Sequence, residues 1–214
     1  AGFYEQSRKI ILQFAKFEEG GTLPNMIRAE DVSNRDTSDA PLWLFAAVKE
    51  YISYCSKDIL NEKVDGRTLL EVLESIAENY QRGTDNGIKM DEQSGLIFSP
   101  SHFTWMDTNY PAGTPREGYP VEIQALWEAA LRFLSQTKTK NPSRWAELAE
   151  KVRENISLLY ENKNGLSDCL HCSPGTPANE AEPDDHCRCN QLFAITLGAI
   201  SNKKLAEKIL QNCQ

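Results

Sequence analysis

Apolar residues recur every three to four positions over several stretches of the chain, which is the spacing of one face of an α-helix. Residues 3–17 place Phe3, Ile10, Phe14 and Phe17 on or near one such face. Residues 40–54 are apolar almost all round, which indicates a helix that is buried on several sides. The same spacing predicts helices over residues 3–17, 40–54, 68–82, 120–136, 143–162, 190–199 and 203–212.

Residues with capping preference stand at two of the predicted helix starts. Ser38 or Asp39 is expected to cap the helix over residues 40–54, and Ser143 the helix over residues 143–162. A capping side chain accepts a hydrogen bond from a free backbone N–H of the first turn.

The helical spacing is interrupted in two places. Residues 87–90 and 95–98 have the composition of two short strands around a turn, which predicts a β-hairpin. Residues 167–186 contain three prolines and a glycine, and we expect them to form a long loop.

The predicted helices alternate in character. The second, fourth and sixth are strongly apolar, whereas the others are amphipathic, and long polar loops with aromatic residues precede the strongly apolar ones. An inner ring of helices buried on both sides, surrounded by an outer ring exposed on one side, would produce this alternation. The pattern predicts an all-α fold, an α/α toroid of helical hairpins with a small β-hairpin insertion. An irregular all-α bundle is the alternative.

Composition and charge narrow the class of protein. The 214 residues are 40% hydrophobic and 25% charged, with a formal net charge of −8, as in an ordinary globular domain. An acidic chain without a basic run repels phosphate backbones, so no nucleic-acid partner is expected. No apolar run approaches the roughly 20 residues of a membrane span, and charged residues near the start exclude a signal peptide there. We therefore expect a soluble protein with no membrane partner.

The loop before residues 40–54 is the first candidate for chemistry. It places Asp39 and Trp43 beside a helix N-terminus. A carboxylate can accept hydrogen bonds from sugar hydroxyls, and an aromatic ring can stack on a pyranose, so the loop could recognise a sugar. Asp39 could equally cap the helix and Trp43 could fill the core.

The loop over residues 101–119 is the second candidate. Asp107 follows Trp105 and Met106, and apolar neighbours could desolvate its carboxyl group and raise its pKa. A carboxyl that is protonated near neutral pH can donate its proton to a glycosidic oxygen. Glu122 lies in the first turn of the following helix, where the helix dipole favours its charge. A loop cap for Asp107 and N-terminal electrostatics for Glu122 are the alternatives.

Six segments occur in an order, and with gaps, that resemble one known family. They are residues 34–43, the hairpin end Gly95-Leu96-Ile97-Phe98, Thr104-Trp105-Met106-Asp107, Thr114-Pro115-Arg116, Pro120-Val121-Glu122-Ile123-Gln124-Ala125-Leu126-Trp127 and Asn190-Gln191-Leu192-Phe193-Ala194. The set resembles the amylo-α-1,6-glucosidase part of glycogen debranching enzymes, glycoside hydrolase family 133, from about residue 21 onward.

This resemblance implies an (α/α)6 toroid that hydrolyses the single α-1,6-linked glucose of a branch stub with inversion. By similarity, Asp107 would be the general acid. The residues that match the substrate-pocket motifs of the family are Asp39, Trp43, Trp105, Arg116, Glu122, Asn190 and Gln191. The resemblance further implies an α-glucan partner such as glycogen or limit dextrin, no cofactor for catalysis, and a cytoplasmic location.

The chain is too short to form the whole (α/α)6 toroid that the resemblance implies. An (α/α)6 toroid needs six helical hairpins, and the seven predicted helices cannot supply them. We expect residues 1–214 to be a single domain, the N-terminal or central part of an incomplete toroid that is truncated at its C-terminal side. The general base would lie beyond Gln214, so this chain alone would be inactive, because an inverting glycosidase needs two carboxyls about 6.5–9.5 Å apart. Exposed apolar flanks of the partial toroid could drive self-association.

Two other functions remain open at this point. One is another inverting (α/α)6 α-glucosidase that acts on a different linkage. The other is a non-catalytic carbohydrate-binding module that keeps the aromatic residues but hydrolyses nothing.

Cysteines gather in the predicted loop near the C-terminus, in a C-x2-C and a C-x-C pair. They are Cys169, Cys172, Cys187 and Cys189. Four thiolates, or a mixture with His171 or His186, could close a tetrahedral structural zinc site. Disulfides and plain reduced thiols are the alternatives, and a cytoplasmic location would favour reduced thiols.

Overall fold

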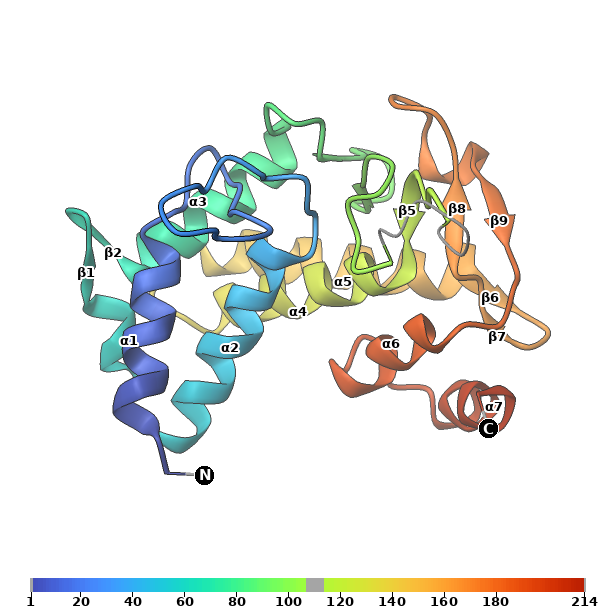
Figure 1. Cartoon of the computed structure of the whole chain (residues 1–214). Helices are drawn as coiled ribbons and strands as arrows, with labels where there is room; N and C mark the ends of the chain where they lie inside the picture. The colour runs from blue at the N-terminus through green and yellow to red at the C-terminus, as the bar shows by residue number, and fades with distance from the viewer. Residues whose placement is uncertain (1, 107–113, 214) are drawn as a thin grey trace.

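Helices dominate residues 2–106 and 114–213, the part of the chain that this computed structural model describes (Figure 1). The α-helices are α1 (Tyr4–Ala15), α2 (Ala40–Tyr54), α3 (Leu69–Arg82), α4 (Val121–Ser135), α5 (Pro142–Tyr160), α6 (Leu192–Thr196) and α7 (Lys203–Asn212). Short 3-10 helices are η1 (Lys57–Asn61), η2 (Ala178–Glu180) and η3 (Cys189–Gln191). The prediction of a mainly helical fold is confirmed.

The strands are two or three residues long and pair in antiparallel fashion. They are β1 (Lys63–Val64), β2 (Arg67–Thr68), β3 (Lys89–Met90), β4 (Ile97–Phe98), β5 (Gly118–Pro120), β6 (Glu161–Asn162), β7 (Gly165–Leu166), β8 (Cys169–His171) and β9 (Glu182–Asp184). Consecutive strands form the hairpins β1–β2, β3–β4 and β6–β7, whereas β5, β8 and β9 form one sheet in that order. The β3–β4 hairpin confirms the predicted insertion.

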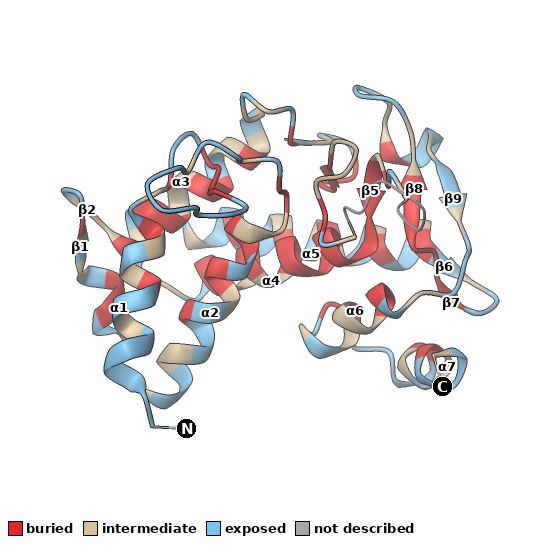
Figure 2. Cartoon of the chain, viewed as in Figure 1, coloured by how far each residue is buried: buried red, intermediate tan, exposed pale blue. Residues whose placement is uncertain are grey.

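The helices form two groups joined by a central pair. In Figure 1, α1 and α2 lie at the N-terminal end, α6 and α7 at the C-terminal end, and α4 and α5 run across the middle. The three-stranded sheet lies at the C-terminal end, above α6 and α7. Burial is densest along α4 and the adjoining strands β5 and β8 (Figure 2). Helix α4 therefore connects the two groups through the core.

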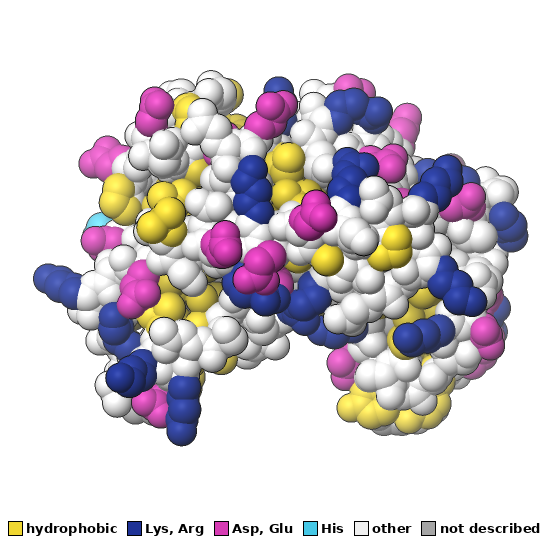
Figure 3. Space-filling view, turned by 180° about the vertical axis from the view of Figure 1, so that it is seen from behind, with side chains coloured by type: hydrophobic (Ala, Val, Ile, Leu, Met, Phe, Trp, Pro, Cys, Tyr) yellow, Lys and Arg dark blue, Asp and Glu magenta, His cyan; other side chains and the backbone are white. Residues whose placement is uncertain are grey.

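On the face seen in Figure 3, acidic and basic side chains are interspersed over the whole surface. The lower edge of that face is hollowed by a notch between two lobes. Among the described residues, no helix combines the length and the hydropathy that crossing a membrane would require.

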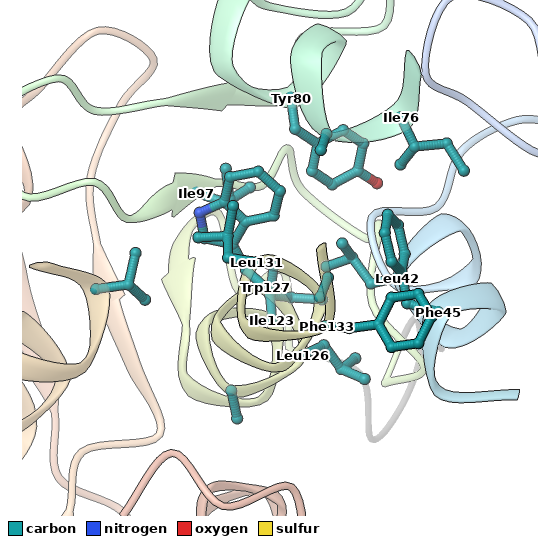
Figure 4. Close-up of a cluster of buried hydrophobic side chains, with 14 of the residues drawn as sticks. Leu42, Phe45, Ile76, Tyr80, Ile97, Ile123, Leu126, Trp127, Leu131 and Phe133 are labelled. Atoms are coloured by element: carbon teal, nitrogen blue, oxygen red, sulfur yellow. The ribbon is translucent and has the colours of Figure 1, made fainter. Parts of the chain in front are cut away.

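The centre of the core is built on α4. Figure 4 shows Trp127 of α4 between Tyr80 of α3 and Ile97 of β4, with Phe45 of α2 on the other side of the helix. The Trp127 ring lies 6.0 Å from the Tyr80 ring, and its indole N–H donates to the carbonyl of Gly95 at 3.1 Å. A fully buried large apolar side chain contributes roughly 2–3 kcal/mol, so this cluster anchors the fold.

The predicted helix bounds hold for α2 and α7 but not for α6. The sequence predicted a helix over residues 190–199, whereas α6 spans Leu192–Thr196. Asn190 and Gln191 form a 3-10 turn before the helix, and Gly198 adopts a φ of 84° after it. The α-helix is therefore short because a 3-10 turn precedes it and the left-handed Gly198 follows it.

The long loop predicted over residues 167–186 is not irregular throughout. It contains β8, η2 and β9, because β8 pairs with β5 about fifty residues earlier in the chain. Gly118 of β5 permits this pairing, since a Cβ atom there would lie 2.1 Å from the carbonyl oxygen of Leu170. Such a long-range pairing leaves no periodic pattern in the sequence.

Two predicted helix caps are wrong. Asp39 does occupy the N-cap position of α2, but its side chain makes no capping hydrogen bond, nor does that of Ser38. The hydroxyl of Thr37 caps the helix instead, accepting the N–H of the first residue of α2 at 3.2 Å. Helix α5 is capped by Asn141 and not by Ser143. Helix α2 begins where it was predicted, whereas α5 begins one residue earlier.

Candidate functional site

The loop before α2 lies against the loop that follows β4. The backbone N–H of Ser38 donates to the carbonyl of Phe103 at 2.7 Å, and the hydroxyls of Ser38 and Ser99 lie 2.8 Å apart. Ser38 and Ser99 are both fully buried. These contacts fix the start of α2, and therefore Asp39 and Trp43, relative to the second candidate loop.

Trp43 of α2 and Trp105 of the second candidate loop contact residues at or just before the start of α6. The indole N–H of Trp105 donates to the side-chain carbonyl of Asn190 at 2.9 Å. The ring of Trp43 meets the ring of Phe193 edge to face, with centroids 5.5 Å apart. Trp43 is 39% exposed and Trp105 is 53% exposed. Two solvent-accessible aromatic side chains are therefore attached to one short segment of the chain.

A surface pocket of about 350 Å³ opens between α1 and the start of α2. Its lining includes Phe14 of α1, Trp43 of α2 and Asp39 at the N-cap position of α2. The Asp39 carboxylate accepts a hydrogen bond from the Thr37 hydroxyl at 2.5 Å. A small-ligand pocket has a comparable volume and the same mixture of aromatic walls and a few polar groups.

A buried ion cluster lies behind Trp105. The side chains of Arg116, Glu122 and Asp168 are at most 1% exposed. The guanidinium of Arg116 contacts both carboxylate oxygens of Glu122, donates from Nε to Asp168 Oδ2 at 2.9 Å, and donates to Thr104 Oγ1 at 3.1 Å. A further bond to the carbonyl of Asp168 at 3.1 Å brings all five N–H donors of Arg116 into use.

The electrostatics of this cluster follow from burial and pairing. Burial raises the pKa of Glu122, and the adjacent Arg116 guanidinium opposes that shift without cancelling it. Burial lowers the pKa of Arg116, but the hydrogen bonds and charge of Glu122 raise it by more, so the guanidinium stays charged. Arg116 also has a φ of 50°, a left-handed conformation that costs a non-glycine residue about 1–2 kcal/mol. The cluster therefore holds its central cation in a strained conformation.

Asp168 links this cluster to the segment before α6. Its Oδ1 accepts the side-chain N–H of Asn190 at 2.7 Å, and its Oδ2 accepts from Arg188 at 3.0 Å. Arg188 donates also to Asp184 at 2.7 Å. Partial burial alone would raise the pKa of Asp184. Hydrogen bonds from His186 and Arg188 outweigh it, so the pKa of Asp184 is lowered overall. The sequence did not point to Asp168, which lies in the predicted loop with no periodic or motif feature of its own.

The side chain of Gln191 contacts the β6–β7 hairpin and not the ion cluster. Its side-chain oxygen accepts the backbone N–H of Leu166 in β7 at 3.0 Å, and the side chain is buried. Gly165 makes this approach possible, because a Cβ atom there would lie 2.4 Å from that oxygen. The amide thereby joins the β6–β7 hairpin to the start of α6.

The residues expected at the substrate pocket thus divide into two groups. Asp39, Trp43 and Trp105 are exposed or half-buried, whereas Arg116, Glu122, Asn190 and Gln191 are at most 2% exposed. Asp107, the expected general acid, lies outside the described residues. Apart from Asp107, the candidate residues lie on segments that the hydrogen bonds above connect to one another.

The cysteines considered for a zinc site have different neighbours from one another. Cys169 is buried with its thiol 3.7 Å from the carbonyl of Arg116, whereas Cys172 faces the loop after β8, with its thiol 3.9 Å from the carbonyl of Thr176. Cys187 lies near the end of α7, 3.2 Å from the carbonyl of Asn212. Among residues 2–106 and 114–213, no group of three or more His, Cys, Asp or Glu side chains is arranged to hold a metal ion. Structural zinc at these cysteines stays a prediction from the sequence.

Two of the comparisons with known proteins indicate the same family, and a third shows a shared fold. The family model described as amylo-alpha-1,6-glucosidase matches residues 1–214. A glycogen debranching enzyme from Saccharomyces cerevisiae is 27% identical over 241 residues, covering 86% of this chain and 16% of that protein. A solved rhamnosidase from Klebsiella oxytoca with rhamnose bound matches 98% of this chain and 37% of its own chain, with a TM-score of 0.64 and 10% identity. That likeness shows a shared helical fold, and the chain spans only a minor part of the length of both relatives.

Proposed function

The chain belongs to the amylo-alpha-1,6-glucosidase family, and from this premise we propose that it carries the acid-bearing part of an α-1,6-glucosidase site. By family it is a glycoside hydrolase. The proposed reaction is the hydrolysis, with inversion, of α-1,6-linked glucose at the branch points of glycogen or limit dextrin. The proposed fold is part of an (α/α)6 toroid, and the proposed location is the cytoplasm, where glycogen is the substrate.

The observation that carries the proposal is that Trp43 and Trp105 contact Phe193 and Asn190, which lie three positions apart in the chain. Two exposed indole rings held at one short segment are suited to a neutral, polyhydroxylated ligand, because sugars offer apolar ring faces and many hydroxyl groups. The interspersed surface charges and the net charge of −8 also favour an uncharged ligand over a polyanion.

The residues take two kinds of role in this proposal. Asp39, Trp43 and Trp105 are accessible and would contact the glucan directly. Arg116 and Glu122 are buried and pair with each other, so they would hold the loops that carry the accessible residues. The buried amides of Asn190 and Gln191 would act in the same supporting way.

Catalysis would require two carboxyl groups. The proposed general acid is Asp107, which would donate its proton to the glycosidic oxygen as the bond breaks. A second carboxylate would remove a proton from the attacking water on the other side of the sugar, about 6.5–9.5 Å away. We place that general base beyond Gln214, and the isolated chain is then inactive.

Glucose release from phosphorylase limit dextrin by the full-length polypeptide tests the proposal. Asp107→Asn should abolish the release, whereas the matched control Asp85→Asn, at an exposed aspartate, should leave it unchanged. NMR of the fresh product should show β-glucose if the reaction inverts. An unchanged rate in Asp107→Asn would contradict the assignment of the acid, and oligosaccharide affinity without turnover would favour a binding module. Glucose release by the 214-residue chain alone would contradict the proposal that the general base lies outside these residues.

A further inference from the structure

We infer that Asp168 is a positioning residue that fixes the ring of Trp105 through the amide of Asn190. The three side chains form a chain of hydrogen bonds from the buried ion cluster to the exposed indole. The inference rests on the proposed function in one respect, namely that Trp105 contacts a glucan. The geometry of the hydrogen bonds is independent of that function.

The carboxylate of Asp168 is held rigidly from several sides. Its Oδ2 accepts from Arg116 at 2.9 Å and from Arg188 at 3.0 Å, and its Oδ1 accepts from Asn190 at 2.7 Å. Its side chain is 1% exposed, so water does not compete for these bonds. Hydrogen bonds between an ionised carboxylate and charged donors are about twice as strong as neutral ones. The oxygen that faces Asn190 therefore has a fixed position.

An ionised carboxylate accepts hydrogen bonds and cannot donate them. Asn190 must therefore direct its NH₂ group toward Asp168, which directs its carbonyl oxygen toward Trp105. The indole N–H of Trp105 is a donor only, so it needs that oxygen. The charge on Asp168 thus sets the orientation of the amide, and the amide sets the orientation of the indole.

Asp168 supports the same loop by a second route. Arg116, which it binds, donates to the hydroxyl of Thr104 at 3.1 Å. Trp105 is 53% exposed, so about half of the residue is accessible to a ligand while its indole N–H is bonded to Asn190. An aromatic ring that is already oriented binds a sugar with a smaller loss of side-chain entropy.

The substitution Asp168→Asn has no orientation that keeps every bond. If its oxygen faces Asn190, its NH₂ group faces the N–H donors of Arg116 and Arg188. If its oxygen faces the arginines, its NH₂ group forces the Asn190 amide to turn, and two donors meet at Trp105. Either arrangement places donors against each other in a buried site.

The exchanged pair Asp168→Asn with Asn190→Asp restores all of these bonds. The new amide at position 168 can present its oxygen to the arginines and its NH₂ group to position 190. The new carboxylate at position 190 then accepts from both that NH₂ group and the indole of Trp105. The number of charges in the cluster is also unchanged, so the exchange separates orientation from charge loss.

NMR of the indole N–H groups in the 214-residue chain tests the inference. The chain has four tryptophans, so four indole signals are expected. In Asp168→Asn, the Trp105 signal should shift and exchange with water at least about tenfold faster, while the Trp127 signal stays unchanged. The exchanged pair should restore the Trp105 signal. Asp184→Asn, which removes a carboxylate from Arg188 but none from Asn190, should leave that signal in place.

Affinity for phosphorylase limit dextrin, measured by calorimetry on the same proteins, is the second readout. Asp168→Asn should weaken binding about fivefold, the effect of one hydrogen bond, and the exchanged pair should recover it. An unchanged Trp105 signal in folded Asp168→Asn, or no recovery in the exchanged pair, would overturn the inference. If Asp168→Asn does not fold, Asn190→Leu decides, because it keeps the ion cluster and must alter the Trp105 signal. A lack of dextrin affinity in the unmodified chain would overturn the glucan ligand, and the indole signals would still decide the role of Asp168.

Discussion

Replacing Arg116 by methionine removes the cation of the buried cluster while it keeps most of the side-chain length. The substitution deletes five hydrogen bonds from the guanidinium. Glu122 loses the partner that contacts both of its oxygens, although its carboxylate remains 1% exposed. Asp168 keeps its bonds to Arg188 and Asn190. Glu122 is therefore the group that determines the cost.

The magnitude follows from the isolation of that charge. Removing one partner of a buried ion pair costs about 3–5 kcal/mol, because the other charge stays out of water without compensation. The left-handed conformation at position 116 does not offset this cost, since methionine is strained there as well. Domains are stable by about 5–15 kcal/mol, so we expect Arg116→Met to remove a third or more of the free energy of unfolding.

The loss should depend on pH, with a sign set by Glu122. Burial already raises the pKa of Glu122, and in the variant the opposing guanidinium is absent, so the pKa of the folded state rises further. Below the unfolded-state pKa of about 4.3, the carboxyl is neutral in both states and the penalty for a buried charge is absent. Stability of the variant should then fall as the pH rises through the pKa of the folded state.

Urea unfolding followed by tryptophan fluorescence, at about pH 7 and about pH 4.5, measures both effects. The deficit relative to the unmodified chain should be larger at the higher pH by at least about 1 kcal/mol. Adding Glu122→Gln to Arg116→Met should recover about 2 kcal/mol at neutral pH, whereas Arg82→Met, at an exposed arginine, should cost under about 0.5 kcal/mol. A deficit of equal size at both pH values, or one under about 1 kcal/mol, would refute the reasoning.

Two further predictions concern the C-terminal part of the chain, one on the stability of a glycine variant and one on the reactivity of two cysteines. Gly165→Ala should destabilise it by about 2–4 kcal/mol in thermal unfolding, because the new Cβ atom meets the Gln191 amide at a φ of 136°. Gly175→Ala, with a φ of 86° but no atom within 4 Å of the new Cβ, should cost only about 1–2 kcal/mol, and equal losses would contradict the clash. Iodoacetamide at about pH 8 should modify exposed Cys187 before Cys169, because burial raises the pKa of the Cys169 thiol. Mass spectrometry of partial digests gives the order, and early modification of Cys169 would contradict its burial.

The sequence predicted those parts of the fold that depend on local patterns. The apolar spacing of α2 and α7 and the composition of the β3–β4 hairpin are properties of short stretches, and both were recovered. The pairing of β5 with β8 and the shortening of α6 depend on contacts across the molecule, which no local pattern records.

The candidate site was predicted as a set of residues but not as an arrangement. The resemblance to a family supplied Trp43, Trp105, Arg116 and the others, and Asp107 remains a prediction. The separation into accessible and buried members could not be predicted, because it depends on long-range contacts such as the bond between Asp168 and Arg116, which spans 52 positions. Asp168 is an ordinary polar residue of a predicted loop until the fold brings it to the cation.

The bond between Trp105 and Asn190 has a consequence for the order of folding. It joins residues 85 positions apart, and the entropy of closing so long a loop must be overcome before the contact forms. The contacts of α4 with α5 and with Tyr80 of α3 join segments that are nearer in the sequence and can form first. During synthesis, Trp105 therefore cannot form this bond until Asn190 has left the ribosome. Until then the indole of Trp105 has no hydrogen-bond partner in the segment before α6. A slowly translated or truncated chain would be most exposed to aggregation at this stage.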